Sequence, residues 1–259
     1  MTALLEHLQE RSREDRKLLV PYLMAGIPDA DVFPAVLGEI AGLADAVEVG
    51  LPYSDPLMDG PVIATAGERV LRNGIGPSRA LGLMERARTD GVPRVVMTYY
   101  NPIHRVGEDA FCERVASAGG AGLIVPDLPL EESGSLREAA ARHGLGWVPL
   151  VAPTSSPERV AAAAETCTGF VYAVSSLGVT GVRESLSERA AAVATACKAA
   201  TDLPVLVGIG ISSGAQAVEA ARHADGVVIG SALVRAVIEE GGAAAVELLR
   251  EVRAAMDAG

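Results

Sequence analysis

Short apolar runs alternate along the chain with longer stretches in which Ala, Leu, Glu and Arg recur at helical spacing. The runs are rich in Val, Leu and Ile and stay apolar at consecutive positions, which is typical of parallel strands buried on both faces. They predict eight strands, over residues 18–23, 46–49, 94–98, 122–125, 146–151, 169–174, 204–207 and 226–229. Each run is followed by a stretch that favours a helix.

The main helices are predicted over residues 31–43, 62–72, 108–118, 133–142, 157–164, 187–199, 213–221 and 232–237. Three more, over residues 4–13, 78–88 and 243–256, are additional to this alternation. Eight strand–helix units without a linker predict an α/β fold, a closed (β/α)8 TIM barrel that forms a single domain over residues 1–259 with extra helices. Helix 4–13 is expected to cover the bottom of the barrel.

An open, doubly wound sheet is the structural alternative to the barrel. Such a sheet usually has fewer strands and carries a glycine-rich turn of the form G-x-G-x-x-G after its first strand. In this chain that turn reads Met24-Ala25-Gly26-Ile27-Pro28, which is no dinucleotide fingerprint. The pattern therefore favours the closed barrel.

The net charge of −11 argues against nucleic acid or an anionic membrane surface as a partner. The first twenty residues carry charges throughout and show no signal-peptide core, and no apolar run reaches the roughly 18 residues that span a bilayer. We therefore expect a cytoplasmic protein. An anionic substrate would need a local binding device, because the field of the whole chain repels it.

Glycine-bearing segments follow the last three predicted strands, at residues 175–181, 208–212 and 230–231. In a TIM barrel the carboxyl ends of the strands form the working face, and phosphate commonly binds beyond the last strands. Glycine lets backbone N–H groups approach an anion closely, and a helix N-terminus adds unpaired donors. Each segment alone is a weak signal, but the three together predict a phosphate site.

Few residues at the predicted strand ends can carry the remaining chemistry. A Schiff-base aldolase needs a lysine there, but Lys17 precedes the first strand and Lys198 lies in a helix. The four histidines are scattered, which argues against a metal site. The side chains that remain are Glu48 at the end of the second strand, Asp59 in the loop that follows, Asp127 after the fourth strand and Tyr172 in the sixth.

A carboxylate that ends an apolar strand, as Glu48 does, is costly to bury unless it is hydrogen-bonded or used. Paired carboxylates in different environments can divide acid and base work between them, which makes Glu48 and Asp59 the catalytic candidates. The structural alternatives are a salt bridge for Glu48 and a turn position for Asp59 or Asp127.

The chain also resembles the tryptophan synthase α subunit family over nearly its whole length. The resemblance rests on residues 47–61, 99–103, 125–129, 131–133, 151–154, 178–181, 208–212 and 230–232, in this order and spacing. It implies retro-aldol cleavage of indole-3-glycerol phosphate to indole and glyceraldehyde 3-phosphate. Glu48 would act as general acid and base, Asp59 would stabilise positive charge on the indole nitrogen, and Tyr172 would line the catalytic site.

The resemblance implies the other site residues as well. Gly181, Gly210, Gly230 and Ser231 would bind the phosphate, Tyr22, Met97, Phe170 and Ile209 would form apolar walls around the indole, and Asp127 and Thr180 would complete the substrate-binding set.

A partner and its cofactor follow from the same resemblance. The family's β subunit uses pyridoxal phosphate and receives the indole, whereas the chain itself would need no cofactor and no metal. Pro52, Asp55 and Asn101 would contact that β subunit in an α2β2 complex. Two alternatives stay open, namely a free-standing lyase that supplies indole to a specialised pathway and a silent activator of a β subunit.

Overall fold

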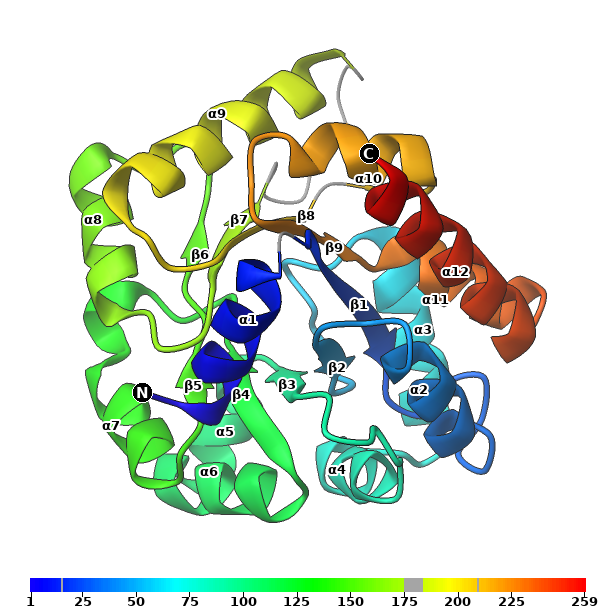
Figure 1. The fold of residues 1–259 in the computed structure, drawn as a ribbon. Coiled ribbons are helices and arrows are strands. Elements are labelled where there is room, and N and C mark those ends of the chain that lie inside the picture. The colour runs from blue at the N-terminus through cyan, green and yellow to red at the C-terminus, as the bar shows by residue number, and fades with distance from the viewer. Residues whose placement is uncertain (15, 175–183, 209) are drawn as a thin grey trace.

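The computed structural model describes residues 1–14, 16–174, 184–208 and 210–259. Within these residues the strands are β1 (Leu18–Met24), β2 (Val47–Gly50), β3 (Arg94–Met97), β4 (Gly120–Ile124), β5 (Gly146–Trp147), β6 (Leu150–Val151), β7 (Val171–Val174), β8 (Val205–Gly208) and β9 (Gly226–Ile229). Neighbouring strands pair in parallel, and the strand order is β5-β4-β3-β2-β1-β9-β8-β7-β6. Figure 1 shows the sheet curled into a ring with helices outside it.

The ring closes through the short piece of chain between β5 and β6. These segments stand at opposite ends of the strand order, yet only Val148 and Pro149 separate them in the sequence. Val148 N donates to Leu123 O at 3.0 Å, toward β4, and Tyr172 N donates to Pro149 O at 3.0 Å, toward β7. Because proline has no N–H, the predicted strand 146–151 appears as two segments. The predicted barrel is confirmed.

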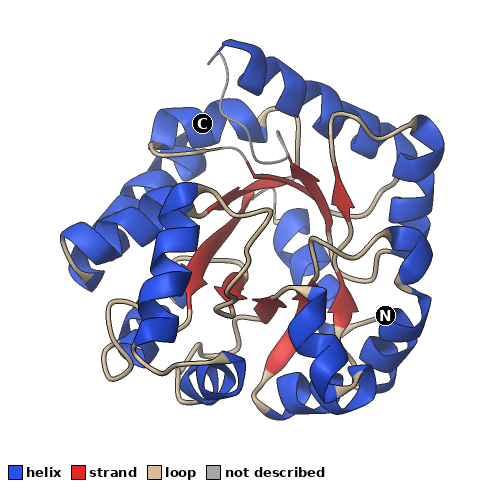
Figure 2. Ribbon diagram, turned by 180° about the vertical axis from the view of Figure 1, so that it is seen from behind, coloured by secondary structure: helices blue, strands red, loops and turns tan. Residues whose placement is uncertain are grey.

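The helices are α1 (Ala3–Arg13), α2 (Phe33–Ala41), α3 (Pro61–Arg72), α4 (Pro77–Glu85), α5 (Tyr100–Val106), α6 (Glu108–Ser117), α7 (Gly134–Arg142), α8 (Pro157–Thr166), α9 (Glu184–Ala200), α10 (Gly214–Ala221), α11 (Ser231–Glu239) and α12 (Gly242–Ala258). Figure 2 shows them surrounding the strands. The pattern did not predict α5 or the 3-10 turn Leu130–Glu132. Asn101-Pro102 is typical of a turn, but Pro102 lies in the first turn of α5, where its missing N–H costs nothing.

Helix α1 covers the N-terminal end of the barrel, as its sequence predicted (Figure 1). Leu4 and Leu8 are fully buried in a cluster with Val20, Phe170 and Leu206 from the inside of the ring. A Cβ at Gly122, Gly146 or Gly169 would lie between 2.7 and 3.0 Å from Leu4 Cδ2. These glycines therefore make room for Leu4 of α1. Because α1 closes this end of the barrel, a binding site can open only at the opposite end.

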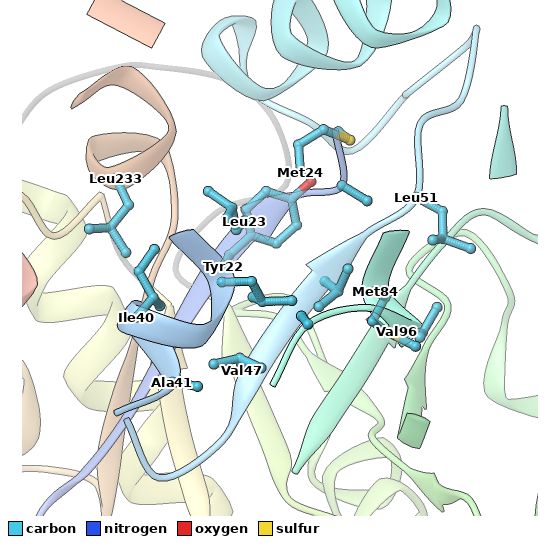
Figure 3. Close-up of a cluster of buried hydrophobic side chains, with 14 of the residues drawn as sticks. Tyr22, Leu23, Met24, Ile40, Ala41, Val47, Leu51, Met84, Val96 and Leu233 are labelled. Carbon is cyan, nitrogen blue, oxygen red and sulfur yellow. The ribbon is translucent and has the colours of Figure 1, made fainter. Parts of the chain in front are cut away.

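The larger apolar cluster lies between the ring and the outer helices. In Figure 3, Leu23 of β1 and Val47 of β2 lie on the side of Ile40 of α2 and Leu233 of α11, whereas Val96 of β3 lies beside Met84 of α4. Successive strand residues point to opposite faces, so Val20 and Tyr22 of β1 point into the ring while Leu23 packs outside it. The register of β1 and β2 places Tyr22 beside Glu48.

Asp45 joins three segments at the bottom of the barrel. It is fully buried, accepts a hydrogen bond from Leu19 N at 2.8 Å, and forms ion pairs with Arg11, Arg16 and Arg253 at 3.1, 3.5 and 3.4 Å. Arg253 is itself buried, and its other ion-pair partner, Asp257, is about half exposed, so the loss of Asp45 leaves this buried charge with a single counter-ion that faces solvent.

We expect Asp45→Ala to lower the free energy of unfolding by about 3 kcal/mol, measured by urea denaturation. Asp202→Ala, at an exposed position, is the control and should change it by less than about 0.5 kcal/mol. A cost below about 1 kcal/mol for Asp45→Ala would contradict the role of this ion cluster.

Candidate active site

A cavity of about 250 Å³ opens at the carboxyl ends of the strands. The described residues that line it are Tyr22, Glu48, Met58, Asp59, Gly60, Ile63, Met97, Ile124, Pro126, Leu150, Tyr172, Val174, Gly208, Gly210, Ile211, Val228, Gly230 and Ser231. They come from both halves of the barrel, so the ring itself assembles the site. Both carboxylates that the sequence singled out as the catalytic pair face this one space.

Glu48 lies within β2 and is only 3 % exposed. Its Oε2 has no hydrogen-bond partner among the described residues, which rules out a salt bridge between those residues and this atom. Burial first, and then the charge of Asp59, raises the pKa of Glu48 to about 8. At neutral pH this carboxyl group therefore holds its proton and is available as a general acid.

Asp59 lies in the loop between β2 and α3, next to Gly60, the N-cap of that helix. It is half-buried, and burial raises its pKa to about 6, against the lowering effect of a hydrogen bond with Tyr99. Asp59 is thus chiefly ionised at pH 7 while Glu48 is chiefly protonated. Two carboxyl groups whose environments separate their pKa values are the usual sign of divided acid–base roles.

Tyr99 contacts the loop that carries Asp59, and the sequence pattern did not single it out. It follows β3, is only 1 % exposed, and its hydroxyl accepts a hydrogen bond from Met58 N at 3.0 Å. Its ring stacks on Tyr53, with centroids 5.0 Å apart. Tyr99 thus fixes the loop that carries Asp59. Its place directly after a strand was the available signal, but the contact itself depends on tertiary packing.

Tyr172 faces the cavity from β7. A Cβ at Gly208 would overlap the Tyr172 ring, so the absence of a side chain there lets the ring lie across the end of β8. Burial, and then the charge of Glu48, holds the pKa of Tyr172 well above its ordinary value. The group is therefore a neutral phenol that can donate a hydrogen bond beside Glu48.

The glycine segments lie where the phosphate site was expected, as far as the structure describes them. Gly230 immediately precedes α11, and Gly210 and Ser231 line the cavity with it. The N-terminal N–H groups of α11 thus lie at the edge of the cavity, where helix geometry leaves them without partners in the helix. Thr180, Gly181 and Ile209, which the sequence also suggested, lie outside the described residues.

Two predicted substrate-binding residues lie apart from this cavity, whereas Met97 lines it. Phe170 is fully buried below it in the cluster around Leu4, with its ring 6.0 Å from that of Tyr172. Asp127 lines a neighbouring space of about 340 Å³ and accepts a hydrogen bond from Tyr100 N at 2.9 Å. Asp127 thereby holds the beginning of α5. A contact of Phe170 or Asp127 with substrate stays a prediction.

The residues expected to contact a partner gather on one side of the barrel. Pro52 and Asn101 line a largely apolar hollow of about 390 Å³ between the loop after β2 and α5. Asp55, in the same loop, is exposed and accepts a hydrogen bond from Ser54 Oγ at 2.7 Å. Within the described ranges, no helix is both long enough and apolar enough to cross a bilayer.

A closed (β/α)8 barrel that holds a protonated and an ionised carboxyl group around one cavity defines an enzyme with acid–base chemistry at its strand ends. The model of the family described as tryptophan synthase alpha chain matches residues 8–257. The chain therefore belongs to the tryptophan synthase alpha chain family. It is a carbon–carbon lyase of the kind that cleaves indole-3-glycerol phosphate to indole and glyceraldehyde 3-phosphate.

Individual relatives agree with this assignment. The tryptophan synthase alpha chain of Streptomyces avermitilis is 47 % identical over 240 residues, which cover 92 % of this chain and 87 % of that protein. A structure of Mycobacterium tuberculosis tryptophan synthase matches with a TM-score of 0.92 and 43 % identity, over 100 % of this chain and 99 % of the other. The alpha subunit from Legionella pneumophila str. Paris matches over 100 % of both chains, with a TM-score of 0.91 and 32 % identity.

Proposed function

We propose that Glu48 and Asp59 carry out the cleavage of indole-3-glycerol phosphate in the cavity described above. The observation that carries this proposal is the pair of carboxyl groups that line one cavity with pKa values of about 8 and about 6. The first can give a proton at neutral pH, and the second supplies a fixed negative charge. Among the described residues, the rest of the lining is tyrosine phenol, the Ser231 hydroxyl, backbone and apolar side chains.

The reaction begins with transfer of the Glu48 proton to C3 of the indole ring, which leaves positive charge on the ring nitrogen opposite Asp59. The ionised Glu48 then accepts the proton of the hydroxyl group on the carbon attached to C3. The bond between C3 and that carbon breaks, and its electron pair returns to the ring and neutralises the nitrogen. The carbon becomes the aldehyde of glyceraldehyde 3-phosphate, and Glu48 regains its starting proton.

The pH dependence of kcat/KM should follow from these protonation states. Below about pH 6, Asp59 gains a proton and its negative charge is lost. Above about pH 8, Glu48 loses the proton that it must donate. We therefore expect a bell-shaped profile with its limbs near these values, measured as initial rates of indole release. Activity that continues to rise above pH 9 would contradict the acid role of Glu48.

The phosphate group of the substrate would bind the backbone around Gly210, Gly230 and Ser231 at the N-terminus of α11. We expect Gly230→Asp to raise KM at least about tenfold, because the new carboxylate repels the substrate phosphate. Steric hindrance should contribute little, since a Cβ at this position would make only an ordinary contact of 3.5 Å with Tyr22 Cβ. Gly230→Asn, of equal size and no charge, is the matched control. Equal KM values for the two variants would contradict a phosphate contact at this position.

The chain is also proposed to work in the cytoplasm in an α2β2 complex with a tryptophan synthase β subunit, which supplies pyridoxal phosphate and consumes the indole. The clustering of Pro52, Asp55 and Asn101 beside one apolar hollow supports this assignment. Tryptophan synthase structures from Mycobacterium tuberculosis are among the close structural matches.

One experiment tests the proposed function and its alternatives together. Indole release from indole-3-glycerol phosphate is measured for the purified chain alone and after addition of a β subunit from a tryptophan synthase. We expect release by the chain alone and a faster rate with the β subunit. Release that the β subunit does not change would indicate a free-standing lyase. No release by the chain, together with faster turnover by the β subunit, would indicate a silent activator.

A further inference from the structure

Tyr22 places a buried hydroxyl group in the cavity, although the sequence suggested only an apolar wall at this position. The side chain is 3 % exposed, and its Oη has no hydrogen-bond partner among the described residues. Leaving a buried polar atom unpaired destabilises the protein, and phenylalanine would fill the same space without that cost. Such an atom in the wall of a cavity indicates a contact that a ligand completes.

The Tyr22 ring extends between the two ends of the cavity. At its root, a Cβ on Gly230 would lie 3.5 Å from Tyr22 Cβ, beside the N-terminus of α11. At its tip, a Cβ on Gly50 would overlap Tyr22 Oη. Gly50 is two residues beyond Glu48 on the same face of β2, and Tyr22 pairs with Glu48 across β1 and β2. The hydroxyl therefore lies toward the acid end, whereas the root of the ring lies beside the phosphate end.

The substrate proposed above has a matching arrangement of groups. A short chain with two hydroxyl groups joins its phosphate to C3 of the indole ring. With the phosphate at Gly230 and C3 at Glu48, this chain must run along the Tyr22 ring. The hydroxyl group nearest to C3 then lies at the Tyr22 Oη end. This is the hydroxyl group whose proton Glu48 removes.

We propose that the Tyr22 hydroxyl donates a hydrogen bond to the oxygen of this substrate hydroxyl group and thereby points its O–H at Glu48. This contact rests on the proposed function and adds a further substrate-binding group to it. During cleavage the substrate proton passes to Glu48, the oxygen becomes the aldehyde oxygen, and Tyr22 keeps its own proton. A donor at that oxygen fixes the direction of the proton transfer.

The surroundings of Tyr22 keep it in the donor state. Burial is the main cause, followed by the charges of Asp59 and Glu48, and together they hold the pKa of Tyr22 well above its ordinary value. The Oε2 atom of Glu48 likewise has no partner among the described residues. Tyr22 Oη and Glu48 Oε2, on paired residues of β1 and β2, thus both lack a partner among the described residues, and one ligand group could bind both.

Tyr22→Phe tests the contact because it keeps the ring and removes only the hydroxyl group. We expect kcat/KM for indole-3-glycerol phosphate to fall at least about tenfold. The inhibition constant of indole-3-propyl phosphate, which has the ring and phosphate but neither hydroxyl group, should change less than twofold. Tyr100→Phe is the matched control, since its hydroxyl group donates to Glu108 at 2.9 Å outside the cavity, and it should leave both constants unchanged.

Two results would overturn the contact in an active enzyme. One is a fall in kcat/KM of less than about threefold in Tyr22→Phe. The other is an equal weakening of substrate and propyl phosphate binding, which would show that the variant disturbs the wall rather than a hydroxyl contact. A wild-type chain that releases no indole would instead overturn the proposed function itself, and the Tyr22 contact with it.

Discussion

Glu48→Gln is expected to lower turnover of indole-3-glycerol phosphate by about 10³–10⁴-fold, the largest effect of any single substitution in this chain. Glutamine keeps the shape of the side chain but can neither give a proton to C3 nor accept one from the hydroxyl group. Both transfers are proposed for Glu48, so one substitution removes both. The loss should therefore lie near the upper end of what a single acid–base group contributes.

The loss should appear in kcat and not in binding. Titration with indole-3-propyl phosphate is expected to give the same dissociation constant for Glu48→Gln and the wild type, because Glu48 is nearly neutral at pH 7 in the free enzyme. Glu138→Gln, at an exposed position on α7, is the matched control for the change of side chain. Turnover within tenfold of the wild type in Glu48→Gln would remove this residue from the proposed mechanism.

Asp59→Asn should lower turnover by about 10²-fold or more. Asparagine keeps the size of the side chain and a hydrogen-bonding oxygen for Tyr99, so the loop should hold its place. The variant loses only the charge that faces the positive indole nitrogen. The measurement is kcat from indole release at pH 7, where Asp59 of the wild type is chiefly ionised.

A second readout separates loss of charge from disturbance of the loop. The acid limb of the pH profile near pH 6 should vanish in Asp59→Asn, while the limb near pH 8 remains. Asp31→Asn, exposed near the beginning of α2, is the control and should keep both limbs. A decrease in kcat of less than threefold, with the acid limb intact, would show that Asp59 has no part in the chemistry.

The barrel could be predicted from the sequence because its signals are local. Consecutive apolar residues mark a strand buried on both faces, and eight such runs with helices between them fit few other folds. The two differences from the predicted elements also have local causes, both at proline residues. Pro149 divides the fifth strand into β5 and β6, and Pro102 lies inside the first turn of α5 rather than in a loop.

The site could be predicted as far as strand ends define it. Glu48 and Tyr172 lie within β2 and β7, Gly230 follows β9, and the ring brings all three around one cavity. Strand alternation gives the direction of a side chain but not its depth, so Phe170 shares the inner face with Tyr172 yet lies one layer below the cavity. The hydroxyl contact of Tyr99, and the lack of a partner for Tyr22 Oη among the described residues, depend on tertiary packing, which no local run of residues encodes.

The most direct test of the account is a crystal structure of Glu48→Gln bound to intact indole-3-glycerol phosphate. We predict the indole ring between residue 48 and Asp59, with the phosphate on the backbone of Gly230 and Ser231 at the beginning of α11. Substrate bound in the neighbouring space beside Asp127, or bound with its phosphate away from α11, would contradict the proposed site.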